Sequence, residues 1–185
     1  MLINFSKHLK FPGAATFTNK NQNMYKWLFV VMITFSINAN AQQKKLYNPL
    51  ADAATDIKIA TAKAKAEGKY LLIQAGGNWC KWCIEFARFA TANPKIDSVM
   101  NASFVWYHLN FSQENENKAT LAKLGFPQRF GFPVFIIVDG EGQRLHTQNS
   151  EYLEDGKSSY NAYKVQSFLE MWSPAALDKR MYSTE

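Results

Sequence analysis

Tyr70-Leu71-Leu72-Ile73-Gln74-Ala75-Gly76-Gly77-Asn78-Trp79-Cys80-Lys81-Trp82-Cys83-Ile84-Glu85-Phe86 is the most informative part of this 185-residue chain. It begins with an apolar run of strand length, and two glycines that can turn the backbone follow. Two cysteines with C-x-x-C spacing then open a segment that is predicted to be helical. Strand, tight turn, C-x-x-C and helix, in this order, form the context in which such a pair carries redox chemistry.

The two cysteines have different expected roles. If Cys80 begins the helix, its sulfur lies near unpaired N–H groups and the positive end of the helix dipole, which favour the thiolate. Lys81 adds a positive charge beside it. Cys83 lies three residues later on the same helical face, close enough for a disulfide. We therefore expect a solvent-exposed Cys80 to attack a substrate and Cys83 to resolve the mixed disulfide.

Two other uses of the pair are possible. A structural zinc site needs four ligands, but the chain has only two cysteines and three isolated histidines. The pair could also be an inert structural disulfide, although so short a loop constrains little of the unfolded chain. We expect no metal ligands and no dissociable cofactor.

The first 41 residues differ in composition from the rest. They contain four lysines and no acidic residue, and an apolar run of eleven residues, 27–37, precedes an Ala-x-Ala sequence that ends at Ala41. This pattern predicts a secretory signal peptide over residues 1–41, with an uncleaved membrane anchor as the alternative. Met24 opens a compact basic start, so we expect it to be the true first residue. The mature domain is then residues 42–185, and we expect it to be exported to a bacterial periplasm.

Charge and cysteine content agree with this assignment. The net charge of +6 falls to +2 without the leader, because 17 basic and 15 acidic residues remain. A near-neutral domain without a basic stripe does not indicate nucleic-acid binding. A pair of cysteines that can form a disulfide is typical of an oxidising compartment.

The order of predicted elements indicates the fold class. Helices are expected over residues 50–67, 80–92, 94–100, 114–124 and 162–172, and strands over 70–74, 104–111, 134–138 and 143–148. We expect 104–111 to be a central strand parallel to 70–74, and 143–148 to return antiparallel as an edge strand. Asn48 is the expected N-cap of the first helix. The pattern predicts a single α/β domain with a mixed central sheet flanked by helices.

The chain resembles the thioredoxin superfamily from about Asn48 to Trp172, and is most similar to exported bacterial thioredoxin-like proteins with a Trp-Cys-Lys-Trp-Cys site. Two features carry the resemblance: Trp79 precedes the first cysteine, and Pro133 precedes the strongest strand. The resemblance implies a cis bond between Phe132 and Pro133, opposite the cysteines, where the backbone receives substrate as an added strand. Pro127 is the alternative proline.

One position departs from the superfamily pattern. Thioredoxins bury an acidic residue six positions before the first cysteine, where it helps to deprotonate the second. Gln74 occupies that position here and cannot accept a proton at neutral pH. A water molecule or Glu85 could take over the role, and the buried lysine of the family maps to His108.

These observations lead to one functional hypothesis and one alternative. The hypothesis is an exported thiol–disulfide oxidoreductase that exchanges protein disulfides through Cys80 and Cys83. Its expected partners are protein substrates and a membrane-bound redox protein, and its mature domain is expected to be a soluble monomer. Substrate would bind over Trp79, Trp82, Phe132 and Pro133, although Trp79 could equally pack under its loop. The alternative is a non-catalytic binding module of the same fold with a structural disulfide.

Overall fold

The computed structural model describes residues 45–183, so the predicted leader, its cleavage site and the expected start at Met24 lie outside the described residues. The described chain forms one four-stranded sheet in the order β2-β1-β3-β4. Its strands are β1 (Tyr70–Gly76), β2 (Phe104–Asn110), β3 (Val134–Val138) and β4 (Arg144–Asn149). Since β1 pairs parallel with β2 and antiparallel with β3, the sheet is mixed, as the sequence predicted.

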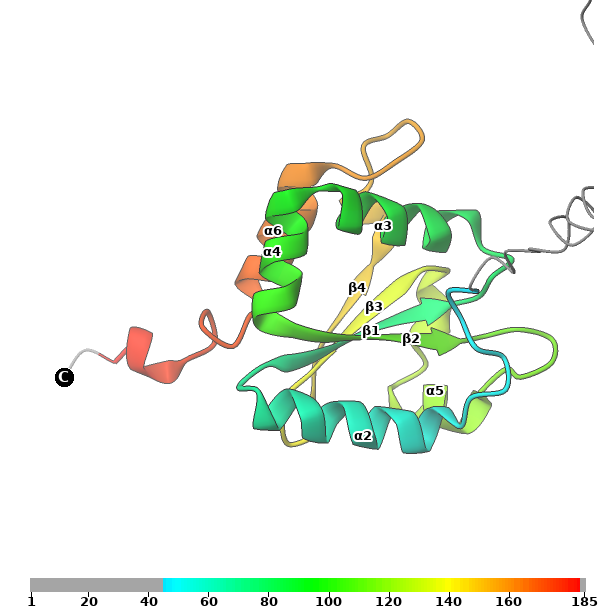
Figure 1. Ribbon diagram of the computed structural model, residues 1–185, viewed down its shortest axis with the longest axis horizontal. Coiled ribbons are helices and arrows are strands. Elements are labelled where there is room, and N and C mark those ends of the chain that lie inside the picture. Colours follow the sequence, from blue (N-terminus) through cyan, green and yellow to red (C-terminus); the bar gives the residue numbers. More distant parts are fainter. Residues whose placement is uncertain (1–44, 184–185) are drawn as a thin grey trace, which may run out of the picture. The chain divides into compact units, whose positions relative to one another are not determined.

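Helices cover both faces of this sheet (Figure 1). The α-helices are α2 (Ala53–Ala66), α3 (Lys81–Ala92), α4 (Pro94–Ser103), α5 (Lys118–Lys123) and α6 (Ala162–Met171), and the 3-10 helices are η1 (Pro127–Phe130), η2 (Ser150–Leu153) and η3 (Lys179–Met181). One face carries α3, α4 and α6, and the opposite face carries α2 and α5. Among residues 45–183, no helix is both long and apolar enough to span a bilayer.

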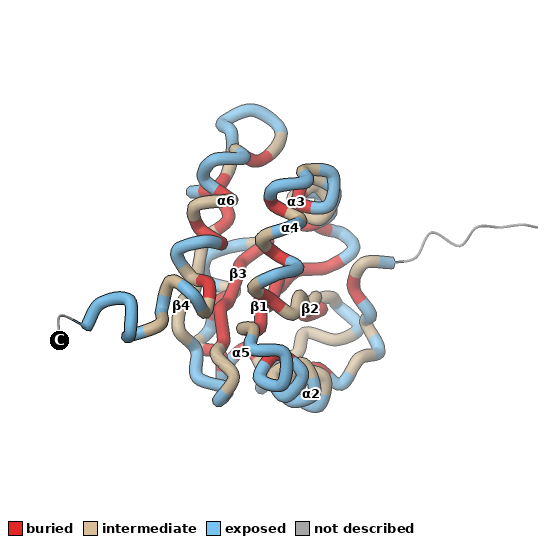
Figure 2. Tube along the Cα trace, turned by 60° about the vertical axis from the view of Figure 1, so that its left-hand side comes forward, coloured by how far each residue is buried: buried red, intermediate tan, exposed pale blue. Residues whose placement is uncertain are grey.

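The alternation of side chains along β1 produces two cores. Leu72 packs with Phe86 of α3 on one face, whereas Leu71 and Ile73 pack with α2 and α5 on the other. Every residue of β1 after Tyr70 is buried, and so is all of β3. Figure 2 shows the buried trace concentrated in these inner strands. The cysteine-bearing turn therefore follows one of the two inner, almost completely buried strands of the domain.

Two expectations about the elements were wrong. The strand from Phe104 is not central, because β2 forms an edge of the sheet, and Trp106 and His108 are only half-buried there. Its aromatic residues pack against helices and not beneath a further strand. The first helix begins at Ala53, since Asp52 is its N-cap, while Asn48 accepts a hydrogen bond from the Leu50 N–H in a local turn. The antiparallel edge strand was predicted correctly.

Candidate redox site

Cys80 and Cys83 form a disulfide at the junction of β1 and α3, with their Cα atoms 5.2 Å apart. Cys80 is the N-cap of α3, and its Sγ accepts a hydrogen bond of 3.1 Å from the Cys83 N–H. An N-cap position places this sulfur at the positive end of the helix dipole. The sequence predicted this geometry, and the same N–H group would stabilise a Cys80 thiolate in the reduced protein.

The expected exposure of Cys80 was wrong for this oxidised state. Only 5% of its surface is exposed, and Cys83 is fully buried. Both pack with Tyr47, and Leu46, Trp82 and Phe132 lie against the same cluster. The segment before α2 thus runs across the cysteines, and the sequence did not reveal this because Tyr47 belongs to no predicted element. Its only visible signal was an aromatic residue in a polar stretch.

Hydrogen bonds hold this covering segment in place. The Asn78 side chain accepts a bond from the Tyr47 N–H at 3.1 Å and donates one to the Tyr47 carbonyl at 2.8 Å. An amide that satisfies both backbone groups of one residue acts like a strand partner. Because Asn78 lies in the turn before Cys80, the covering segment and the cysteine turn are tied directly together.

Position 76 requires glycine because the Cys83 sulfur and the Tyr47 hydroxyl lie close to its backbone. A Cβ atom added at Gly76 would lie 2.4 Å from the Cys83 Sγ and 2.9 Å from the Tyr47 hydroxyl oxygen. Both distances are far below van der Waals contact, so any larger residue must displace the sulfur or the ring. The β1 strand can end directly beneath Cys83 only because Gly76 has no side chain.

Gln74 is fully buried beneath Cys83 and occupies the position of the family's acid. Its amide nitrogen donates to the Cys83 carbonyl at 2.9 Å and to the Tyr47 hydroxyl at 2.7 Å. His108 faces the Tyr47 ring edge-on at 5.4 Å, and burial lowers the pKa of His108 to about 4. The site beneath the cysteines is therefore neutral at physiological pH, with an amide where thioredoxins carry a carboxylate.

Glu85 does not replace that acid. Its carboxylate accepts two hydrogen bonds from Arg88, at 2.9 and 2.7 Å, and one of 2.5 Å from the Ser159 hydroxyl. These bonds keep the pKa of Glu85 below its ordinary value, with Arg88 the largest contributor. Glu85 is engaged with α3 and the loop before α6, and none of these bonds involves a cysteine.

Aromatic residues form a platform next to the disulfide. Trp79 is 57% exposed, its indole N–H donates to the Phe111 carbonyl at 2.7 Å, and its ring meets Phe132 edge-on at 5.6 Å. Phe111 stacks on Phe132 at 4.9 Å. The bond from Phe132 to the buried Pro133 is cis, as the resemblance implied, while Pro127 instead begins η1. Trp79 therefore stands on the surface, not under its loop.

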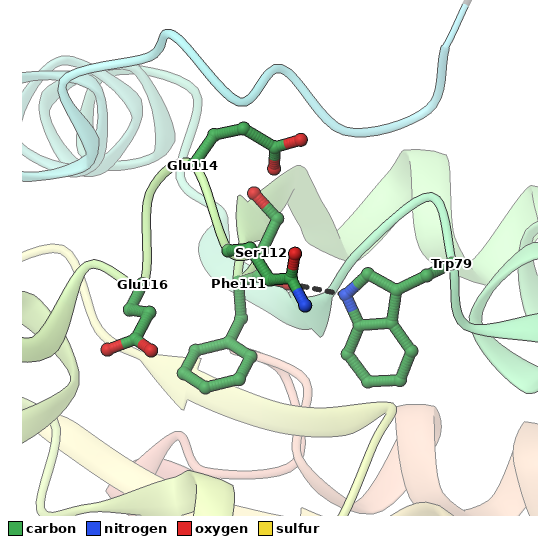
Figure 3. A pocket seen from close by; sticks show the side chains of 6 residues that line it. Trp79, Phe111, Ser112, Glu114 and Glu116 are labelled. Atoms are coloured by element: carbon green, nitrogen blue, oxygen red, sulfur yellow. Dashed lines mark hydrogen bonds between the residues drawn. The ribbon is translucent and has the colours of Figure 1, made fainter.

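A pocket opens beside this platform (Figure 3). Its lining residues are Trp79, Phe111, Ser112, Gln113, Glu114 and Glu116. Trp82 lies elsewhere: it is half-buried and packs edge-on against Tyr160 at 5.5 Å as well as against the cysteines. Among residues 45–183, no three histidine, cysteine or acidic side chains are grouped so that they could hold a metal ion.

The fold agrees with the comparisons with known proteins. A family model described as thioredoxin-like matches residues 52–140, which include both cysteines and Pro133. This segment is thioredoxin-like, and the domain has the thioredoxin-like fold. A disulphide isomerase from Xylella fastidiosa Temecula1 has the same fold, with a TM-score of 0.59 and 23% identity over 68% of this chain and 94% of that chain.

A curated relative has a related name but is much larger than the matched segment. The thiol:disulfide interchange protein DsbD of Salmonella typhi is 27% identical over 86 residues, which are 46% of this chain and only 15% of that protein. The segment that matches the thioredoxin-like family model begins at residue 52, so Tyr47, which covers the cysteines, lies outside it.

Proposed function

We propose that this protein is an exported thiol–disulfide oxidoreductase that acts on protein disulfides through Cys80 and Cys83. One observation carries the proposal: the Cys80–Cys83 disulfide caps the N-terminus of α3 beside the Phe132–Pro133 segment. The helix dipole and the Cys83 N–H both favour negative charge on the Cys80 sulfur, which makes it the better nucleophile at neutral pH.

The reaction is a two-step exchange. In the reducing direction, the Cys80 thiolate attacks a substrate disulfide, and one substrate sulfur leaves as a thiolate that takes a proton from water. The Cys83 thiol then loses its proton to solvent and attacks the Cys80 Sγ, so that the second substrate thiolate leaves. The protein pair is oxidised by two electrons and the substrate is reduced by two. The opposite direction uses the same steps in reverse.

The substrate would bind on the aromatic platform. Trp79 offers an exposed ring next to Cys80, and Phe132 supports it from the loop before β3. An extended peptide can pair with the backbone that precedes Pro133, while its apolar side chains contact Trp79, Phe132 and the adjoining surface of Trp82. This arrangement favours unfolded or extended protein segments that contain a disulfide.

A second function is favoured by the low exposure of Cys80. With 5% of the Cys80 surface accessible, the disulfide could have the purely structural role of fixing the first turn of α3, against which Tyr47 packs, in a binding module without turnover. Under that function, substrate thiols would never form a covalent bond with the protein.

Substitution of each cysteine separates the two functions. We expect Cys80→Ser to abolish reduction of insulin disulfides and Cys83→Ser to accumulate a mixed disulfide that survives denaturing, non-reducing electrophoresis. Activity that persists in Cys80→Ser refutes the catalytic proposal, and the absence of any trapped complex with Cys83→Ser supports the binding module. A glutathione redox titration of the same protein then assigns the direction of exchange.

Export and partners complete the proposal. The basic, apolar and Ala-x-Ala segments of residues 1–41 support a cleaved leader, and the name of the DsbD relative, a thiol:disulfide interchange protein, supports protein thiols and disulfides as partners. The proposal also includes a membrane-bound redox partner and a monomeric mature domain. N-terminal sequencing of protein recovered from the periplasm should begin at Gln42. Recovery of the uncleaved chain in the membrane fraction would refute the cleaved leader.

A further inference from the structure

The orientation of the Gln74 amide fixes the role of the Tyr47 hydroxyl. The amide group that faces the Cys83 carbonyl at 2.9 Å must be the nitrogen, because a carbonyl oxygen can only accept. The same nitrogen lies 2.7 Å from the Tyr47 oxygen and donates to it. Tyr47 therefore keeps its own proton, and among the hydrogen bonds of residues 45–183 its hydroxyl donates none.

The Cys83 sulfur and this hydroxyl both lie against the end of β1 in the same buried cluster, and they share no hydrogen bond while the disulfide is intact. A single point, the Cβ position of an alanine at residue 76, is 2.4 Å from the Cys83 Sγ and 2.9 Å from the Tyr47 oxygen. Both side chains are fully buried, and the Gln74 amide binds the Tyr47 hydroxyl and the Cys83 backbone carbonyl. A disulfide sulfur is a weak hydrogen-bond acceptor, whereas a thiolate is a strong one. A hydrogen bond from the Tyr47 hydroxyl to the Cys83 sulfur would therefore be strong only when Cys83 is a thiolate.

Resting on the proposed function, we infer that Tyr47 is a positioning residue that donates a hydrogen bond to the Cys83 thiolate while Cys83 attacks the Cys80 Sγ. Burial in apolar surroundings disfavours a thiolate, and this site has no carboxylate to remove the proton. A buried hydrogen-bond donor lowers the free-energy cost of the negative charge that Cys83 carries during the attack. The thiol proton of Cys83 itself leaves to solvent. Tyr47 remains protonated throughout, because burial raises the pKa of its hydroxyl far above the ordinary value.

Few other titratable groups face Tyr47. Cys80 and Cys83 contact it, the His108 ring packs against it, and Tyr160 acts on it at longer range. His108 is neutral above about pH 5, since its pKa is lowered to about 4. Between pH 6 and 10, a change in reactivity that depends on Tyr47 therefore reports on the cysteines.

The test compares Tyr47→Phe with a matched control. Tyr160→Phe also removes one buried hydroxyl, which donates to the Trp82 carbonyl of α3 at 3.1 Å and not to a sulfur. The pKa of Cys83 is measured by thiolate absorbance in the Cys80→Ser background. We expect Tyr47→Phe to raise this pKa by about one to two, the value of a lost hydrogen bond to a charged group, and Tyr160→Phe to leave it unchanged.

Kinetics provide the second readout. In the protein with both cysteines, resolution of a mixed disulfide with glutathione on Cys80 should slow by about three- to fifteenfold at pH 7 in Tyr47→Phe, because fewer but more nucleophilic thiolates are present. Above the raised pKa the order of the rates should reverse, because Cys83 is then fully ionised in both proteins and the Tyr47→Phe thiolate is the more nucleophilic; a purely structural effect would not produce this reversal. An unchanged Cys83 pKa, or a slowing that is equal at every pH, overturns the inference.

Two features keep the test decisive. If Tyr47→Phe does not fold, Tyr47→3-fluorotyrosine retains the contacts with a stronger donor and should lower the Cys83 pKa, and no change would overturn the inference. The thiol titration requires no substrate, so the Cys83 pKa can stay unchanged in Tyr47→Phe while Cys83→Ser still traps a substrate. Conversely, the pKa can shift as expected although no substrate is trapped. Failure of this inference and failure of the proposed function are therefore distinguishable.

Discussion

Replacing Gln74 by Glu would restore the acid that thioredoxins carry and would show how this site manages without one. The amide nitrogen of Gln74 donates to two acceptors, the Cys83 carbonyl and the Tyr47 hydroxyl. A protonated carboxyl has one donor, and a carboxylate has none and would face a carbonyl oxygen at 2.9 Å. Full burial adds a desolvation cost for the charge.

These contacts set the sign and size of the effect. Burial raises the pKa of the introduced carboxyl to about 8 in the folded protein, against about 4.3 when unfolded. Between these values the folded state holds a proton that the unfolded state has released, so stability falls as pH rises. The loss relative to the natural protein should grow by about 2.5 kcal/mol from pH 5 to pH 7. Below pH 4 only the lost hydrogen bond remains, about 1 kcal/mol.

Urea unfolding of the oxidised protein at pH 4, 5, 6 and 7 measures this difference. Gln143→Glu serves as the matched control, because residue 143 is exposed and the same substitution there should give a difference that does not depend on pH. A Gln74→Glu protein whose loss of stability is the same at pH 5 and pH 7 would show that the carboxylate is accommodated. The account of a neutral, amide-bridged site would then be wrong.

Three further predictions test the surroundings of the cysteines. Gly76→Ala should destabilise the oxidised protein by about 1–3 kcal/mol in urea, because its Cβ would lie 2.4 Å from the Cys83 Sγ; a change below about 0.5 kcal/mol would contradict the packing described. Between pH 7 and pH 5 the natural protein should lose about 2 kcal/mol of folding stability through His108, because the histidine takes up a proton near pH 6.5 in the unfolded state and only near pH 4 in the folded state. His108→Leu should not show this loss, and identical pH profiles for the two proteins would refute the prediction. Trp79→Ala should lower kcat/KM for a protein disulfide about tenfold while changing stability by less than about 1 kcal/mol, and the exposed Tyr152→Ala should do neither; an unchanged kcat/KM would remove Trp79 from the substrate surface.

The elements with strong periodic patterns were predictable, and the exceptions have physical reasons. The apolar run of β3 and the capped helix α3 were recognisable because each carries its own local signal. The position of β2 at the edge of the sheet was not recognisable from the sequence, because aromatic residues are buried equally well by helices and by neighbouring strands. The start of α2 was misplaced since Asn48 and Asp52 are both good N-caps, and tertiary contacts decide which is used.

The sequence by itself determined the chemistry: two cysteines three residues apart, a glycine-rich turn before them, and a proline before an apolar strand place a disulfide at a helix N-terminus. Local backbone preferences are sufficient for that. Only the tertiary structure decided what surrounds the sulfurs, because Tyr47 reaches Cys83 across a gap of 36 positions and through contacts with Gln74 and Asn78. Contacts between distant segments depend on how the layers pack, and no local pattern encodes them.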